Sequence, residues 1–246
     1  MGSLANSRAP AGTRERQPLV LLAGLLCDEL IWTDVAERLR DVADVHIVTF
    51  PGVSSIGAMA ERALAVAPAR FALAGHSMGG RVALEVLRRA SDRVTALALL
   101  NTGIHPLRDN EAQSRGELVR IAREGGMSAV AAAWLPPMMG APPARVAELM
   151  PRLTAMVERY TPEDFAAQIQ ALLDRPDALK ALSSIGVPTL IASGTNDTWS
   201  PLAQHREMQR LIPHATLVAI ENAGHMAPVE QPDAVARALR EWLGRI

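Results

Sequence analysis

The chain has 246 residues, of which 49% are hydrophobic, and its 25 basic and 26 acidic side chains give a formal net charge of −1. This length and composition are sufficient for a sizeable core, and the balanced charge argues against a nucleic-acid partner. The single cysteine, Cys27, excludes an intrachain disulfide framework and makes a cytoplasmic location the expectation. No apolar run approaches the ~18 residues of a membrane span, so no membrane partner is expected.

Short apolar runs alternate with amphipathic stretches along most of the chain. Residues 1–17 are mostly small and polar, which predicts a flexible tail. The runs predicted as strands cover residues 18–24, 44–52, 71–75, 93–101, 188–194 and 215–221. The stretches with helical spacing cover residues 30–42, 56–67, 81–90, 202–211 and 233–243. Continuous apolar strands separated by helices indicate an α/β fold whose mostly parallel sheet is covered on both faces.

Residues 104–183 interrupt this alternation, because no strand-like run occurs there. Their helical stretches are separated by LPPMMGAPP (135–143) and by single prolines. The pattern predicts a mostly helical insertion between the fourth and fifth strands. It carries Trp134, Met138 and Met139, each of which could line a pocket or equally belong to the core of the insertion.

A serine between glycines stands where the third strand meets a helix. The residues GHSMGG (75–80) place Gly75 two residues before Ser77 and Gly79 two residues after it. A sharp strand-to-helix turn needs small neighbours and lifts the serine hydroxyl above the sheet, beside the helix N-terminus. Ser77 is therefore predicted as a nucleophile, with a simple helix-capping role as the alternative.

A nucleophilic serine needs a base, and His225 is the best candidate among the six histidines. It follows the last strand, at the same sheet edge as Ser77. The side chain of His76 should point away from that of Ser77. His205 falls on a predicted helix and is expected at the surface, while His105 is a remote candidate for the pocket.

The base in turn needs an anion that fixes its tautomer. Asp197, in SGTNDTWSP after the fifth strand, is the predicted residue, and Asp109, after the fourth strand, is the second choice. An ordinary turn aspartate is the alternative for Asp197. The chain order Ser77, Asp197, His225 is the order expected for α/β-hydrolases.

Three motifs together, GHSMGG, GTNDTWSP and NAGHMAPVEQP, resemble the α/β-hydrolase superfamily. The chain is similar to its branch of small esterases, lactonases, haloperoxidase-like enzymes and carbon–carbon hydrolases. The resemblance covers residues 18–246 and implies Ser77 as nucleophile, His225 as base and Asp197 as acid. It also implies a hydrolase core formed by residues 18–103 and 184–246, with a helical cap at 104–183.

The chain departs from the family at two places. Ala23 stands where the family usually has a histidine after its first core strand, although Gly24 remains. Backbone N–H groups need no particular side chain, so those of Leu25 and Met78 are expected to form the oxyanion hole. A β-hairpin that often precedes this strand is expected to be absent, which leaves about six strands.

We therefore expect hydrolysis of an ester, thioester or lactone with an apolar acyl part, without a metal or organic cofactor. Cys27 is expected to be a small buried thiol rather than a nucleophile. The same triad could serve carbon–carbon bond hydrolysis or perhydrolysis, and a low-turnover binding protein or receptor is a further alternative. The pocket wall is expected to come from Leu25, Leu26, Trp134, Met138, Met139, Trp199 and Met226.

Overall fold

The computed structural model describes residues 16–182 and 185–246. Residues 1–15, which make up most of the predicted tail, lie outside the described residues. Gln17 falls within the predicted tail, but it is the first residue of strand β1 (Gln17–Leu22). Its N–H donates to the carbonyl of Val42 (2.9 Å). The folded part of the chain thus begins slightly earlier than its polar composition indicates.

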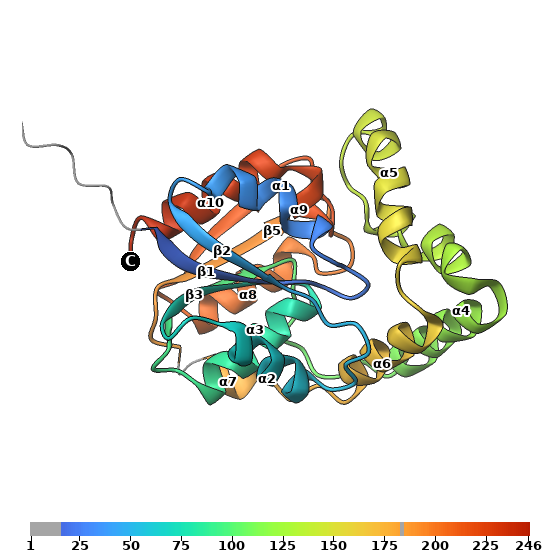
Figure 1. Cartoon of the computed structure of the whole chain (residues 1–246), viewed down its shortest axis with the longest axis horizontal. Coiled ribbons are helices and arrows are strands. Elements are labelled where there is room, and N and C mark those ends of the chain that lie inside the picture. Colours follow the sequence, from blue (N-terminus) through green and yellow to red (C-terminus); the bar gives the residue numbers. More distant parts are fainter. Residues whose placement is uncertain (1–15, 183–184) are drawn as a thin grey trace, which may run out of the picture.

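Six strands form one sheet in which every neighbouring pair is parallel (Figure 1). Their spatial order is β2-β1-β3-β4-β5-β6. Every residue of β3 and β5 is buried, as expected for strands covered on both faces. The predicted α/β fold with a sheet of six strands is confirmed. The strands are β1 (Gln17–Leu22), β2 (Ala43–Val48), β3 (Phe71–His76), β4 (Val94–Leu100), β5 (Thr189–Gly194) and β6 (Thr216–Ile220).

Helices cover both faces of the sheet. On one side α1 packs against α9 and α10, and on the other α2 packs against α3 (Figure 1). Helix α3 begins three residues earlier than predicted, because Gly79 and Gly80 lie in its first turn. The short helix α9 was not predicted. The helices of the core are α1 (Leu30–Leu39), α2 (Ile56–Val66), α3 (Met78–Arg89), α8 (Leu202–Leu211), α9 (Ala227–Glu230) and α10 (Pro232–Leu243).

The segment between β4 and β5 is helical. Helix α4 packs against α5 and α6, and the three stand to one side of the sheet (Figure 1). Helix α4 bends at Gly126, whose φ of 73° lies outside the helical region. The division into core and cap stays a prediction. Among the described residues, no helix is both long and apolar enough to cross a bilayer. The helices are α4 (Glu111–Trp134), the 3-10 turn η1 (Pro136–Met138), α5 (Pro143–Glu158), α6 (Pro162–Leu173) and α7 (Leu179–Leu182).

The strand order determines where a ligand can bind. From β1 the chain moves outward to β2, and from β3 onward it moves in the opposite direction. At such a switch point the loops after the two central strands diverge and leave a crevice at the carboxyl edge. Here these are the loops after β1 and β3, which contain Leu25 and Ser77 respectively.

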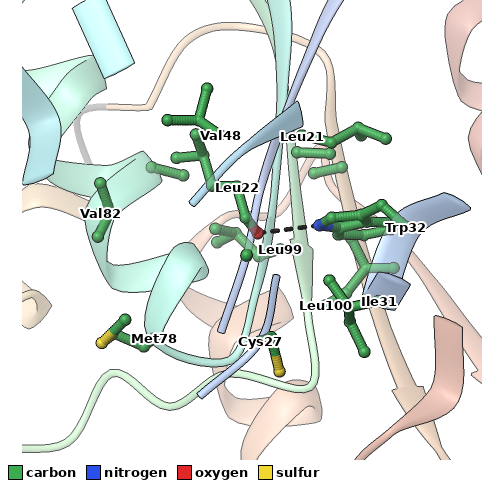
Figure 2. Packing of buried hydrophobic residues seen from close by; sticks show 14 of the residues in the cluster. Leu21, Leu22, Cys27, Ile31, Trp32, Val48, Met78, Val82, Leu99 and Leu100 are labelled. Atoms are coloured by element: carbon green, nitrogen blue, oxygen red, sulfur yellow. Dashed lines mark hydrogen bonds between the residues drawn. The ribbon is translucent and has the colours of Figure 1, made fainter. Parts of the chain in front are cut away.

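The core beneath this edge contains Trp32 of α1, which is fully buried. Its indole N–H donates to the carbonyl of Leu22, the last residue of β1 (3.1 Å), as Figure 2 shows. The ring also lies edge-on to His76, with 6.3 Å between centroids. Trp32 therefore connects α1 to the carboxyl ends of two central strands.

We expect Trp32→Phe to lower the free energy of unfolding by about 1–3 kcal/mol, because the Leu22 carbonyl loses a buried hydrogen-bond donor. Urea denaturation measures the change. Val66→Ala on α2, at a side chain that is 56% exposed, is the control and should change the free energy by less than about 0.5 kcal/mol. Equal stability of Trp32→Phe and the unaltered protein would contradict the structural role of the indole N–H.

Candidate active site

Ser77 occupies a strained turn between β3 and α3. Its φ of 54° and ψ of −117° lie in a region that non-glycine residues rarely adopt. The turn requires glycine on both sides. A Cβ on Gly75 would lie 2.2 Å from the carbonyl oxygen of Gly79, and a Cβ on Gly79 would lie 2.4 Å from that of Leu22. The GHSMGG sequence thus holds the hydroxyl of Ser77 at the carboxyl edge of the sheet.

The structure brings the three predicted side chains together. His225 Nε2 lies 2.8 Å from Ser77 Oγ, and His225 Nδ1 lies 2.9 Å from Asp197 Oδ2. They come from the loops after β3, β5 and β6. Asp109, the second choice for the acid, is exposed in the loop before α4. The arrangement allows His225 to accept the serine proton while Asp197 holds the opposite ring nitrogen.

Asp197 is buried and accepts four hydrogen bonds. Its Oδ1 accepts the N–H groups of Trp199 and Ser200 (both 2.8 Å), and its Oδ2 accepts Asn101 Nδ2 (2.8 Å) as well as His225. Burial alone would raise the pKa of Asp197, but His225 and these donors hold the pKa below its usual value. The carboxylate therefore stays ionised and can stabilise a protonated His225.

Asn101 was not predicted as a site residue. It follows β4 with a φ of 48°, and its Nδ2 also donates to the carbonyl of Gly224 (3.1 Å). One side chain thereby connects the loop of the acid with the loop of the base. The only signal in the sequence is an asparagine at a strand end, where asparagine tolerates the left-handed conformation better than other residues.

His76 holds the backbone of the predicted base. Its Nε2 lies 2.8 Å from the carbonyl oxygen of His225, which makes Nε2 the protonated nitrogen. Burial, helped by nearby His225, lowers the pKa of His76 to about 3, so the ring stays neutral at physiological pH. His76 thus supports the histidine whose ring contacts the Ser77 hydroxyl. The expected direction of the His76 side chain, away from that hydroxyl, stays a prediction.

The expectation that His205 lies at the surface is wrong, because the side chain is fully buried. Its Nε2 accepts the N–H of Thr102 (3.1 Å), and Thr102 Oγ1 donates to the carbonyl of Ser77 (2.6 Å). Burial lowers the pKa of His205, which keeps Nε2 free to accept. Helical position alone could not show that this face of α8 packs against the loop after β4.

Leu25 and Met78 both line the cavity beside Ser77, and the oxyanion hole formed by their N–H groups stays a prediction. Met78 is the first residue of α3, so its N–H has no acceptor within the helix. The neighbouring N–H of Leu26 is occupied, because it donates to Gln168 Oε1 of α6 (2.9 Å). Burial strongly raises the pKa of Cys27 in the same loop, so that cysteine stays an unreactive thiol.

Glu230 joins the loop of His225 to the insertion. Its carboxylate is buried and accepts the N–H groups of Gly140 (2.7 Å), Ala141 (2.5 Å) and Gly224 (2.9 Å). The N–H of His225 donates to the carbonyl of Met138 (2.8 Å). Sequence reasoning missed Glu230, although it lies within NAGHMAPVEQP, because two of its three partners, Gly140 and Ala141, are about 90 residues away.

A cavity of about 380 Å³ opens beside Ser77 and His225. Of the predicted pocket residues, Leu25, Trp134, Met138 and Trp199 line it, and so does His105. Leu26, Met139 and Met226 do not line it, which corrects the prediction. Leu26 and Met226 are fully buried in the core, and Met139 packs against the core from the side. Leu118 of α4 and Leu172 of α6 complete the apolar lining.

Residues 19–238 match the alpha/beta hydrolase family, so the chain belongs to that family. A protein of Klebsiella pneumoniae with the provisional name carbamate hydrolase is 31% identical over 182 residues, which are 71% of this chain and 66% of that protein. The pimeloyl-[acyl-carrier protein] methyl ester esterase of Chromobacterium violaceum is 27% identical over 240 residues, which are 92% of this chain and 93% of the esterase.

A solved structure agrees with this assignment. The structure of a thermophilic esterase from Thermogutta terrifontis superimposes with a TM-score of 0.84 and 29% identity, over 95% of this chain and 91% of the esterase. The likeness covers the sheet, the flanking helices and the insertion together.

We expect Glu230→Gln to lower the free energy of unfolding by about 2 kcal/mol, because an amide turns its NH₂ group toward N–H donors that need an acceptor. The displaced His225 should also reduce kcat by about tenfold to a hundredfold. Urea denaturation and steady-state kinetics measure the two effects.

Glu221→Gln is the matched control, since Glu221 is exposed one residue after β6. It should alter neither quantity. A Glu230→Gln protein that loses stability but keeps full kcat would show that Glu230 does not hold the imidazole in place.

Acid should destabilise the fold through His76. The unfolded chain binds the proton near pH 6.5 and the folded chain only near pH 3, so stability is lost as the pH falls below about 6.5. Between pH 7.5 and 5.5 the loss from His76 should be about 1.4 kcal/mol, measured by urea denaturation. His76→Gln should remove that part of the pH dependence, whereas His214→Gln, at an exposed site, should not. An unchanged pH dependence in His76→Gln would refute this.

Proposed function

We propose that the protein hydrolyses a small carboxylic ester, thioester or lactone through an acyl-enzyme on Ser77. The observation that carries the proposal is the chain of hydrogen-bond distances from Ser77 Oγ to His225 Nε2 (2.8 Å) and from His225 Nδ1 to Asp197 (2.9 Å) at the wall of a cavity. Two relatives named as esterases, from Chromobacterium violaceum and Thermogutta terrifontis, support the same class of reaction.

In the first half of the reaction, His225 takes the proton of Ser77 as Oγ attacks the substrate carbonyl. Asp197 stays ionised and stabilises the imidazolium. The negative charge on the carbonyl oxygen is received by the N–H groups of Leu25 and Met78, and one such donor is worth about 3 kcal/mol in the transition state. His225 then gives its proton to the leaving alcohol, thiol or lactone oxygen.

In the second half, water enters the site and His225 removes a proton from it. The resulting hydroxide attacks the acyl carbonyl, the bond to Ser77 Oγ breaks, and Oγ recovers its proton from His225. The apolar lining next to the triad, formed by Leu25, Trp134 and Met138, receives the hydrocarbon part of the substrate. A cytoplasmic location is part of this proposal and rests on the use of a single cysteine.

We expect Ser77→Ala to lower kcat for p-nitrophenyl esters by about 10⁴-fold or more. The variant should also lose labelling by a fluorophosphonate probe, which reacts with activated serines. Ser91→Ala, at an exposed serine beyond the C-terminal end of α3, should keep both activity and labelling.

A Ser77→Ala protein with full activity would refute the acyl-enzyme. Efficient cleavage of a vinylogous diketone or formation of peracetate, with poor ester turnover, would instead favour carbon–carbon hydrolysis or perhydrolysis. A serine that is not labelled in the unaltered protein would favour a binding protein.

A further inference from the structure

The lining of the cavity beside Ser77 is charged as well as apolar. Four arginines line it, namely Arg81, Arg108, Arg115 and Arg175, but only one carboxylate, Glu111. The chain as a whole carries a net charge of −1, so this excess of positive charge is a local property of the cavity. His105, Ser114 and Gln204 add further polar groups to the same lining.

Glu111 already forms ion pairs with two of the arginines. It forms a bidentate pair with Arg175, with both N–O distances at 2.7 Å, and its Oε1 also accepts Arg115 Nε (2.9 Å). Arg175 in addition donates to the carbonyls of Leu172 and Pro106. Arg175 therefore has a sufficient structural role, since it ties α6 to the start of α4.

Arg81 has no such role. Its one hydrogen bond runs from Nη2 to the carbonyl of His105 (3.1 Å), and it forms no ion pair within the described part of the chain. Burial and the neighbouring guanidinium of Arg175 lower the pKa of Arg81 to about 9, which leaves it protonated at pH 7. Arg81 is thus a half-buried cation without an ion-pair partner among the described residues, although the carboxylate of Glu111, beyond ion-pair distance, partly offsets its charge. Groups with such a perturbed pKa are common at functional sites.

Arg115 lines the cavity, and its Nε meets Glu111. Its remaining N–H donors have no hydrogen-bond partner among residues 16–182 and 185–246. Arg81 lies in the first turn of α3, four residues after Ser77, and both residues line the cavity. A ligand anion between Arg81 and Arg115 would therefore share the cavity with a carbonyl at Ser77. The apolar lining would hold the carbon chain that joins them.

We propose that the substrate is an anionic ester or lactone, whose carboxylate or phosphate is bound by Arg81 and Arg115 while its carbonyl meets Ser77. The inference rests on the proposed function and specifies its substrate class. Planar guanidinium groups recognise such oxyanions through paired N–H donors. The anion supplies Arg81 with the direct ion-pair partner that it lacks among the described residues.

The test compares charged and neutral substrates of equal length. Monomethyl esters of dicarboxylic acids and O-acetyl esters of ω-hydroxy acids place a carboxylate on the acyl side and on the leaving-group side respectively. O-acetyl esters of ω-hydroxyalkyl phosphates supply the phosphate. Uncharged methyl and acetyl esters of the same chain lengths are the reference. We expect kcat/KM to be at least tenfold higher for one charged series.

Arg81→Gln and Arg115→Gln should each lower kcat/KM for that series by about 10- to 100-fold. They should leave the neutral esters within about threefold. Arg81→Lys should restore part of the preference. Arg120→Gln is the control, since Arg120 lies on the exposed side of α4 paired with Glu117 and Glu124. No preference for any charged series, or equal losses for charged and neutral esters in both variants, would overturn the inference.

A binding measurement separates this inference from the proposed function. Ser77→Ala protein, which cannot form an acyl-enzyme, should show a rise in Tm with millimolar adipate or hexyl phosphate and none with the matched diamide or hexanol. Arg81→Gln in the same background should abolish that rise. Hydrolysis of neutral esters that depends on Ser77, together with no anion-induced rise in Tm, would leave the hydrolase intact and reject the anion site.

Discussion

The arrangement of the site depends on how the backbone of His225 is held. Its N–H donates to Met138 of the insertion, and its carbonyl accepts from His76 at the end of β3, each at 2.8 Å. With both backbone groups bound, the ring orientation is set by the side-chain bond to Asp197. A flexible loop residue thereby gains the positional precision that general-base chemistry requires. The two partners lie 149 and 87 residues away in the chain, so only the complete fold can place this imidazole.

The insertion therefore does more than cover the cavity. Through Met138, Gly140 and Ala141 it contacts the loop of His225, directly or through Glu230. The contact is so close that a Cβ on Gly224 would lie 2.4 Å from the N of Gly140. Through Arg175 and Glu111 the far part of the insertion is tied to the loop after β4. The walls of the cavity and the triad thus form one hydrogen-bonded unit.

Much of the fold and the three triad residues can be predicted from the sequence, because local patterns determine them. The strands are mostly apolar runs, although β2 includes Asp44 and His46. The three site residues lie in loops that follow strands whose carboxyl ends share one edge. Asn101, His205 and Glu230 could not be found in this way. Their roles come from partners that are distant in sequence. The sequence alone does not distinguish a polar residue that will be buried from one that will be exposed. The sequence does not predict the arginines of the cavity as site residues, for a related reason. Arg81 and Arg115 occur in helices, where a charged residue ordinarily marks the solvent side, and Arg108 and Arg175 lie in loops.

The hydrogen bonds of Glu230 to Gly140, Ala141 and Gly224 also limit where a ligand can enter and leave the cavity. Lifting the loop at residues 138–141 would strip the carboxylate of Glu230 of two partners and pull on the backbone of His225. Entry or exit of a ligand through this loop would therefore disrupt the alignment of the triad at every turnover. Exposed Arg108 and Asn110 also border the cavity, and within the described residues neither hydrogen-bonds to a member of the triad or to Glu230. An entrance at these residues would leave the imidazole in place. The positive charge of Arg108 would attract the anionic group of a ligand.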